Sequence, residues 1–412
     1  MAQLNITLNQ EEILDLLSKD RDEAFKKLLT DSLNILLRAE SDEQIGAKSY
    51  ERTEERTDFR NGYRDRELTT RIGKITLHVP RHRNVPFKTM VFDNYARSET
   101  ALITTMAEMV VNGVSTRKVA KVMETLCGEG YSKSTVSEVC KKLDGEVSRF
   151  SKRPLEGGYP FVLIDATYFK VREDLRTISK AFMVAYGTNK DGRREVLGFG
   201  VYPRESVDTW TDFLTSLKKR GLNDVFMFTS DAHEGIIKAI AKVYPEAAWQ
   251  RCQAHFARNI SDKAPKKYQA GINSELKEMF NAKTIEEARK KRDSIISDYS
   301  DVAESAMQCL DEGFDSSMTA MFLPENLYKI YRTSNHIERL NRELKRRSKA
   351  LGTFPNADSL LRLMGSVLIE LNESHSKEKR VFSAETYKAL IDKGIAAKLK
   401  ALAEEQRLLL AA

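Results

Sequence analysis

The chain has 412 residues, of which 41% are hydrophobic and 31% are charged, and its formal net charge is +7 at pH 7. This length predicts two to four domains, and the composition is that of a folded globular protein rather than a disordered chain. The positive charge favours an anionic partner without naming it. A basic protein with no such partner would have the same composition, so this alternative stays open.

Three further features predict a cytoplasmic protein with no membrane partner. No apolar run approaches membrane-spanning length, and no basic-then-apolar signal pattern opens the sequence. The cysteines lack the spacing of a disulfide framework, which favours a reducing compartment. These cysteines are Cys127, Cys140, Cys252 and Cys309.

Residues 1–45 carry apolar side chains at helical spacing, from Ile13 and Leu16 to Leu36 and Leu37. This pattern predicts two helices that pack on each other or on a second subunit.

The segment 46–95 predicts a small basic β-module. Residues 68–70 and 75–79 alternate apolar and polar side chains around a glycine-containing turn, which indicates two short strands. Arg60 and Arg64 stand among aromatic residues, a combination that suits contact with DNA phosphates. A solvated charged face is an equal alternative, because acidic residues are interspersed with the arginines.

Residues 96–150 predict a helix-turn-helix outline. A helix that begins near Ser115 or Thr116 is followed by a glycine-containing turn, and Ser132 or Ser134 caps a second helix. In DNA-binding proteins the second helix of such a pair enters the major groove. Helical hairpins without this function share the outline. The residues that we expect to meet phosphates or base edges are Arg117, Lys118, Lys133, Ser137 and Lys141.

After a linker with Pro154, the pattern changes to alternating strands and helices. Three strands, within 161–171, 180–188 and 195–202, precede a helix, a strand, a second helix and a last strand that ends near Cys252. This order resembles the ribonuclease-H-like fold. We therefore expect an α/β catalytic domain (160–253 and 326–375), an all-helical insertion (254–325) and C-terminal helices (376–412).

Two acids mark a candidate site in this domain. Asp165 lies inside the first strand, and Asp231 follows the fourth strand, which should be its neighbour in the sheet. Two carboxylates held close together repel each other unless a cation is bound, and oxygen ligands suit Mg²⁺. Asp231 could instead cap the next helix, whereas a purely structural role for Asp165 inside a strand is harder to explain.

A basic helix that begins at Ser334 or Asn335 supplies a third acid, Glu338. With Asp165 and Asp231 it would hold two Mg²⁺ ions per active site, for which Mn²⁺ can substitute. Alternatively, Glu338 closes a capping box with Asn335. The arginines that we expect to follow the DNA backbone beside it are Arg332, Arg339, Arg342 and Arg346.

Cys252 and His255 follow the last strand and form a Cys-x-x-His pair. A structural zinc site normally needs a second such pair, and none is evident. His255 orienting a phosphate or an acid near the metals is one interpretation, and simple packing is the other.

Four motifs resemble the Mutator-type transposases of bacterial insertion sequences. They are IDATYFKVRE around Asp165, TSDAHEGIIKAI around Asp231, WQRCQAHFARNI, and YRTSNHIERLNRELKRRSKALGTFPN around Glu338. The resemblance covers about residues 40 to 375. It implies that Asp165, Asp231 and Glu338 are the catalytic acids and that Cys252 and His255 are the family's Cys-x-x-His signature.

The resemblance also implies a function, which is transposition of DNA in the bacterial cytoplasm. We expect a homodimer that binds double-stranded DNA at the element's terminal inverted repeats, cleaves strands there with Mg²⁺ and joins them to target DNA. Two alternatives remain, a DNA-binding regulator without catalysis and a plain metal-dependent nuclease.

Overall fold

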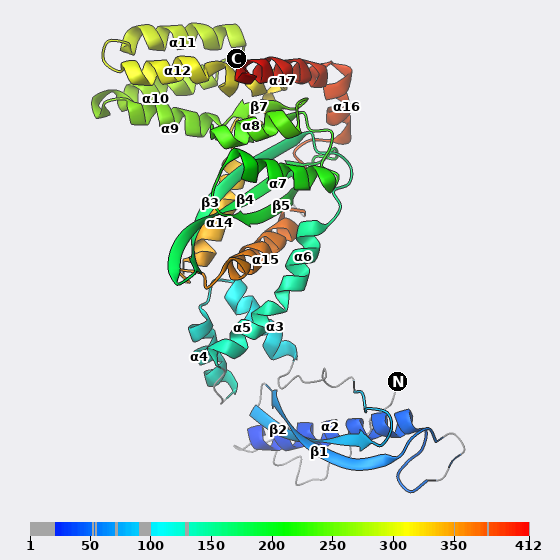
Figure 1. The fold of residues 1–412 in the computed structure, drawn as a ribbon. Helices are drawn as coiled ribbons and strands as arrows, with labels where there is room; N and C mark the ends of the chain where they lie inside the picture. The colour runs from blue at the N-terminus through cyan, green and yellow to red at the C-terminus, as the bar shows by residue number, and fades with distance from the viewer. Residues whose placement is uncertain are drawn as a thin grey trace. The chain divides into compact units, whose positions relative to one another are not determined.

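The computed structural model describes residues 21–51, 53, 56–70, 73–89, 100–127, 132–349, 351–376 and 379–411. The chain divides into two compact units, Met1–Lys142 and Leu143–Ala412, which are considered separately (Figure 1). Among the described residues, no helix is long and apolar enough to cross a membrane.

The first unit contains a helix that packs on a β-hairpin. Helix α2 (Arg21–Ile45) lies against β2 (Gly73–His82), which pairs antiparallel with β1 (Arg60–Thr70). Both strands are longer than predicted, because the charged residues that precede Leu68 also join the ladder. The other predicted helix lies outside the described residues. The core of this module consists of Leu37, Leu68, Ile75, Leu77 and Val79.

Three further helices complete the first unit: α3 (Thr100–Val111), α4 (Thr116–Cys127) and α5 (Lys133–Lys141). The hydroxyl of Ser132 caps α5 by accepting a hydrogen bond from the backbone N–H of Thr135 at 3.1 Å. The predicted helix pair is therefore present, although its turn lies outside the described residues. Helix α3, which the sequence pattern did not reveal, packs on both members of the pair.

The second unit is built on a five-stranded mixed sheet in the order β5-β4-β3-β6-β7. β3, β4 and β5 are antiparallel neighbours, whereas β6 pairs parallel with both β3 and β7. The predicted adjacency of the first and fourth strands is confirmed. The strands are β3 (Phe161–Glu173), β4 (Arg176–Thr188), β5 (Arg194–Tyr202), β6 (Met227–Ser230) and β7 (Ala248–Arg251).

Helices cover both faces of this sheet (Figure 1). Helices α7 (Val207–Lys219) and α8 (Glu234–Val243) bury their apolar faces against one side, where Val162 and Ile164 of β3 join their core. Because side chains alternate along a strand, Asp165 points to the other side. There α14 (Asn335–Ser348) and α15 (Ala357–Ser376) contact β3, and α6 (Leu143–Lys152) packs on α15.

The segment after β7 is helical, as predicted, and has a core of its own. Its helices surround buried residues such as Phe256, Leu276, Leu310 and Phe314. The chain then returns to the sheet, and the predicted last helix is split at Gly394, which has a φ of +68°. The elements are α9 (Gln253–Lys263), α10 (Lys266–Phe280), α11 (Ile285–Tyr299), α12 (Glu304–Ser317), a short 3-10 helix η1 (Thr319–Phe322), α13 (Glu325–Tyr331), α16 (Ala384–Asp392) and α17 (Ile395–Ala411).

Truncation of one α7 side chain tests the core of the second unit. Leu214 is fully buried between α7 and the sheet, so we expect Leu214→Ala to lower the free energy of unfolding by about 2–5 kcal/mol. Urea unfolding followed by tryptophan fluorescence reports this unit, because both tryptophans, Trp210 and Trp249, belong to it. The control Leu409→Ala, at a site 78% exposed, should change stability by less than about 0.5 kcal/mol, and equal losses would contradict the assigned core.

Candidate active site

The parallel pairing of β3 and β6 brings two acids to corresponding positions. Leu163 pairs with Thr229, and Asp165 and Asp231 each stand two residues farther along their chains. Asp165 is still within β3, whereas β6 has ended at Ser230. Asp231 therefore lies at the carboxyl end of its strand, the usual position for ligand-binding residues in α/β sheets. The two carboxylates are close enough to interact, since the charge of Asp231 raises the pKa of Asp165.

The carboxylate of Asp165 is largely buried and has two hydrogen-bond donors. The backbone N–H of Ala166 donates to Oδ1 at 2.9 Å, and the amide of Asn341 on α14 donates to Oδ2 at 2.8 Å. Burial and the neighbouring charge of Asp231 raise the pKa of Asp165 to about 7, and the hydrogen bonds only partly oppose them. A bound cation would remove this penalty.

Asp231 does not cap the helix that follows it, so this structural alternative is wrong. The N-cap of α8 is His233, whose Nδ1 accepts a hydrogen bond from the N–H of Gly235 at 3.1 Å. Within the described residues, Asp231 Oδ1 accepts a hydrogen bond from the N–H of His233, at 3.4 Å. Its carboxylate is therefore placed by the end of β6 rather than by a capping role.

The residues just before α14 are held next to the ends of β6 and β7 by hydrogen bonds to their backbone carbonyls. The hydroxyl of Thr229 donates to the carbonyl of Tyr331 at 2.9 Å, and the N–H of Gln253 donates to the carbonyl of Arg332 at 3.0 Å. Phe161 of β3 also stacks on Tyr331, with ring centroids 4.2 Å apart. The helix that carries the third predicted acid therefore begins beside the strands that carry the first two.

Glu338 does not close a capping box. The N-cap of α14 is Ser334, which makes no side-chain capping bond. Instead, the Ser334 hydroxyl donates to Glu338 Oε1 at 3.1 Å, and His255 Nε2 lies 3.7 Å from the same oxygen. The carboxylate of Glu338 therefore takes part in tertiary contacts with α9, while its side chain stays 28% exposed.

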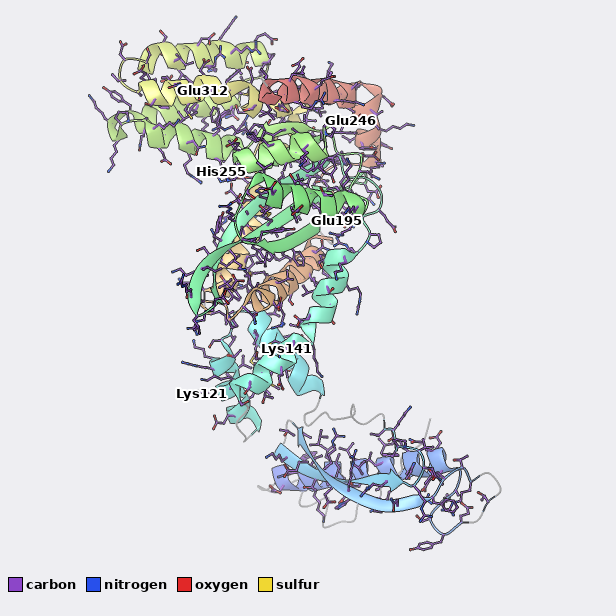
Figure 2. All side chains as sticks on the ribbon, viewed as in Figure 1. Lys121, Lys141, Glu195, Glu246, His255 and Glu312 are labelled. Atoms are coloured by element: carbon purple, nitrogen blue, oxygen red, sulfur yellow. The ribbon has the colours of Figure 1, made fainter. Side chains whose placement is uncertain are left out.

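Cys252 is the N-cap of α9, directly after β7, and His255 lies in the first turn of this helix. His255 is labelled in Figure 2. The hydrogen bond with Cys252 raises the pKa of His255 to about 9, and the charges of Glu338 and Asp165 act in the same direction. Burial alone would raise the pKa of the Cys252 thiol, but hydrogen bonds with His255 and Ser334 outweigh burial and lower it. His255 thus lies within electrostatic reach of both Glu338 and Asp165.

The potential metal ligands divide into two sets that share this neighbourhood. Over the described part of the chain, the group whose donor atoms all lie within 4.8 Å of one another is Cys252, His255 and Glu338. Asp165 and Asp231 form the second set, in which every donor is a carboxylate oxygen. Only the second set consists entirely of the oxygen ligands that Mg²⁺ prefers. A divalent cation there would also offset the repulsion between Asp165 and Asp231, which raises the pKa of Asp165.

The residues predicted to contact DNA fall into two classes. Arg60 forms an ion pair with Asp42, and the guanidinium of Arg332 donates to the carbonyl of Phe280 at 2.7 Å. These two arginines therefore make contacts within the protein. The others have exposed side chains: Arg64, Arg117, Lys118, Lys133, Ser137, Lys141, Arg339, Arg342 and Arg346.

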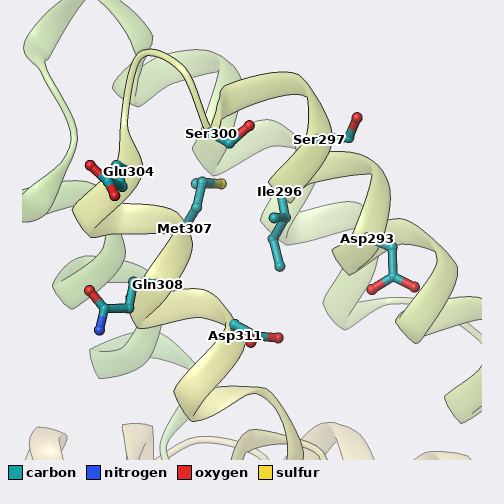
Figure 3. A pocket seen from close by; sticks show the side chains of 8 residues that line it. All are labelled: Asp293, Ile296, Ser297, Ser300, Glu304, Met307, Gln308 and Asp311. Atoms are coloured by element: carbon teal, nitrogen blue, oxygen red, sulfur yellow. The ribbon is translucent and has the colours of Figure 1, made fainter.

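Two of the hollows among the described residues lie away from this site. One, of about 490 Å³, is lined by residues of α11 and α12, and three of them, Asp293, Glu304 and Asp311, are acidic (Figure 3). Such a surface disfavours a phosphate backbone. The other, of about 400 Å³, includes Lys283 and Lys329 among its lining residues. Neither contains an acid of the candidate site.

Sequence reasoning missed Ser334 and Asn341 as members of the site. They stand four residues before and three residues after Glu338, so all three lie on one face of α14. This spacing was the available signal. Both are buried, with 1% and 5% of their surface exposed, and both contact proposed site residues.

Comparisons with known proteins agree on one family. A family model described as "Transposase, Mutator family" matches residues 1–378. The transposase for insertion sequence element IS256 in transposon Tn4001 of Staphylococcus aureus is 42% identical over 377 residues, which cover 90% of this chain and 96% of that protein. The transposase for insertion sequence element ISRM5 of Rhizobium meliloti is 38% identical and covers 89% of this chain and 92% of its own length. The transposase for element IS1081 of Mycobacterium tuberculosis is 34% identical, with 92% of each chain covered.

The raised pKa of Asp165 predicts a pH-dependent cost in the metal-free protein. The folded protein holds its proton up to about pH 7, whereas the unfolded chain releases it near the ordinary value of 3.8. Stability should therefore fall as pH rises through this window and stay reduced above it. We expect Asp165→Asn to remove the cost, so that in EDTA at about pH 8 the variant is more stable than the wild type by up to about 4 kcal/mol.

Urea unfolding between about pH 4 and pH 8 measures this difference, which should vanish at the acidic end. The control Asp208→Asn removes an exposed carboxylate at the first turn of α7 and should show no such trend. If Asp165→Asn and the wild type differed in stability by the same amount at about pH 4 and at about pH 8, the raised pKa of Asp165 would be contradicted.

Proposed function

The chain belongs to the Mutator family of transposases, and on this premise we propose that Asp165, Asp231 and Glu338 cut and join DNA at the ends of its insertion sequence. The observation that supports the proposal is the neighbouring placement of Asp165 in β3 and of Asp231 directly after the parallel strand β6. Helix α14, which contacts β3, carries Glu338. The protein acts in the bacterial cytoplasm, where its DNA substrate is found.

The order of the sheet supports a ribonuclease-H-like catalytic domain. Counted along the domain, the strands follow the order 3-2-1-4-5, with the acids on the first strand and just after the fourth. The chain leaves this domain after β7, forms helices α9 to α12, and returns with α14. Glu338 therefore follows the helical segment in the sequence, whereas Asp165 and Asp231 precede it.

Asp165 and Asp231 would hold Mg²⁺ at the carboxyl end of β6, and Glu338 would be the third ligand. When bound, the ions polarise the phosphate and activate the attacking hydroxyl, either of water for cleavage or of a DNA 3′ end for joining. Asn341 keeps the Asp165 carboxylate oriented through its 2.8 Å hydrogen bond. His255 and Ser334 do the same for Glu338, because both contact its Oε1.

DNA binding involves both units. In the second unit, Arg339 and Arg342 are exposed on α14, and within the described residues neither forms an ion pair. In the first unit, exposed residues of α4 and α5, such as Lys133 and Lys141, contact the terminal inverted repeats. Two ends of the element must be held together before joining, so the active form is a homodimer.

Neutral substitution of each acid tests the catalytic assignment. We expect Asp165→Asn, Asp231→Asn and Glu338→Gln to reduce strand cleavage and joining on the order of 10³-fold or more while DNA binding persists. Cleavage of labelled DNA that carries the terminal repeats, with Mg²⁺ present, measures both reactions.

Asp208→Asn, which changes an exposed acid outside the site, should cleave like the wild type. If the variant of any one of these three acids still cleaves DNA, that acid is not part of the catalytic site. Wild-type protein that binds the repeats but never cleaves would be a regulator, and protein that cleaves without joining would be a plain nuclease.

Two arginines on α14 test the path of the DNA. Arg342 is exposed without an ion pair among the described residues, whereas Arg346 forms two 2.6 Å hydrogen bonds to Glu343. We expect Arg342→Ala to weaken DNA binding and to reduce the slope of log affinity against log salt by about 1, since one phosphate contact is lost. Arg346→Ala should reduce the slope less, because its charge is already balanced. Equal slopes for Arg342→Ala and wild type would exclude Arg342 from the DNA path.

A further inference from the structure

Cys252, His255 and Glu338 bring a sulfur, a nitrogen and an oxygen donor to one place. All three donor atoms lie within 4.8 Å of one another. Cys252 and His255 occupy the first turn of α9, and Glu338 comes from α14. The two helix starts are held together by the hydrogen bond from the N–H of Gln253 to the carbonyl of Arg332, so the cluster is fixed by the backbone of both elements.

The Ser334 hydroxyl lies among the three donors and contacts each of them. It is 3.1 Å from Cys252 Sγ, 3.5 Å from His255 Nδ1 and 3.1 Å from Glu338 Oε1. Four polar groups therefore converge on one small volume. They include a buried thiol that accepts a second hydrogen bond, from the N–H of Ser334 at 3.3 Å. Such bonds favour the thiolate, the form of cysteine that binds metals.

The chemistry of this donor set selects a particular class of metal. Thiolate and imidazole ligands suit Zn²⁺, whereas Mg²⁺ prefers oxygen ligands alone. A four-coordinate zinc ion with three protein ligands takes one further group, and the Ser334 hydroxyl lies close to all three donors. Cys252 is fully buried, but His255 and Glu338 are 25% and 28% exposed, so an ion reaches the cluster from their side.

We propose that Cys252, His255 and Glu338 form a binding site for Zn²⁺ that is separate from the Mg²⁺ chemistry of the two aspartates. Zinc binding would take the carboxylate of Glu338 for itself. If Glu338 is a catalytic acid, a consequence that rests on the proposed function, then Zn²⁺ inhibits the Mg²⁺-dependent reaction by withdrawing this carboxylate from it.

Cobalt(II) serves as a spectroscopic probe of the site, without DNA and without catalysis. We expect one equivalent of Co²⁺ to give the thiolate-to-cobalt charge-transfer band of a cysteine ligand in the near ultraviolet. Added Zn²⁺ should bleach this band, because zinc displaces cobalt from tetrahedral sites of this kind. The full-length protein, reduced and freed of metal by a chelator, is the material for this titration.

Variants of three side chains make the assignment specific. Cys252→Ser should abolish the band, and His255→Gln should weaken Zn²⁺ binding by more than the roughly 10–100-fold that loss of an outer-shell partner costs. Cys309→Ser, which changes another buried free cysteine of the second unit, should keep both the band and the affinity. Circular dichroism of each variant shows that it is folded.

The outcomes separate this site from the catalytic proposal. Absence of the band in wild type, or its persistence in folded Cys252→Ser, would overturn the zinc site whatever the protein does to DNA. If the band behaves as expected and Mg²⁺-dependent cleavage survives saturating Zn²⁺, the site stands but its inhibitory consequence is wrong. Wild-type protein that fails to cleave at all would count against the proposed function and leave the cobalt result unaffected.

Discussion

The second unit depends on the burial of one carboxylate, that of Asp165, beside a second, that of Asp231. Parallel pairing of β3 and β6 brings the two acids to corresponding positions of neighbouring segments, where the charge of Asp231 acts on Asp165. The cost appears as the raised pKa of Asp165. A protein that keeps two acids in such a position bears a permanent electrostatic penalty, which a divalent cation between them would turn into an attraction.

Helix α14 connects this pair to the rest of the proposed site. Ser334, Glu338 and Asn341 lie along one of its faces and contact two other elements: the Ser334 hydroxyl and the Glu338 carboxylate face Cys252 and His255 at the start of α9, and the Asn341 amide meets Asp165 of β3. Because these contacts lie on one rigid helix, a shift of α14 would change the surroundings of Glu338 and of Asp165 together. The insertion between β7 and α14 is thereby coupled to the geometry of the acids, since α9 is its first helix.

The succession of strands and helices and the helix start at Ser334 or Asn335 could be predicted from local periodicity and capping residues. The adjacency of β3 and β6 was predicted from the resemblance of this succession to the ribonuclease-H-like fold. The assignment of the three acids to catalysis remains a prediction. Contacts between residues that are far apart in the chain could not be predicted from the sequence. Nothing near Arg332 in the chain indicates that its guanidinium meets the carbonyl of Phe280, and only the folded insertion brings His255 to Glu338. Nothing in the sequence distinguishes Arg346, which pairs with Glu343, from an exposed arginine such as Arg342, which forms no ion pair within the described part of the chain.

The most direct test of the three-acid site is to locate a metal in crystals of the protein bound to the DNA ends of its element. Mn²⁺ replaces Mg²⁺ and is identified by anomalous X-ray scattering. We expect Mn²⁺ to be coordinated by carboxylate oxygens of Asp165 and Asp231, with Glu338 among the ligands and the scissile phosphate in contact with the ion. Mn²⁺ bound at the phosphate without Asp165 and Asp231, or with Glu338 turned away from it, would contradict the account.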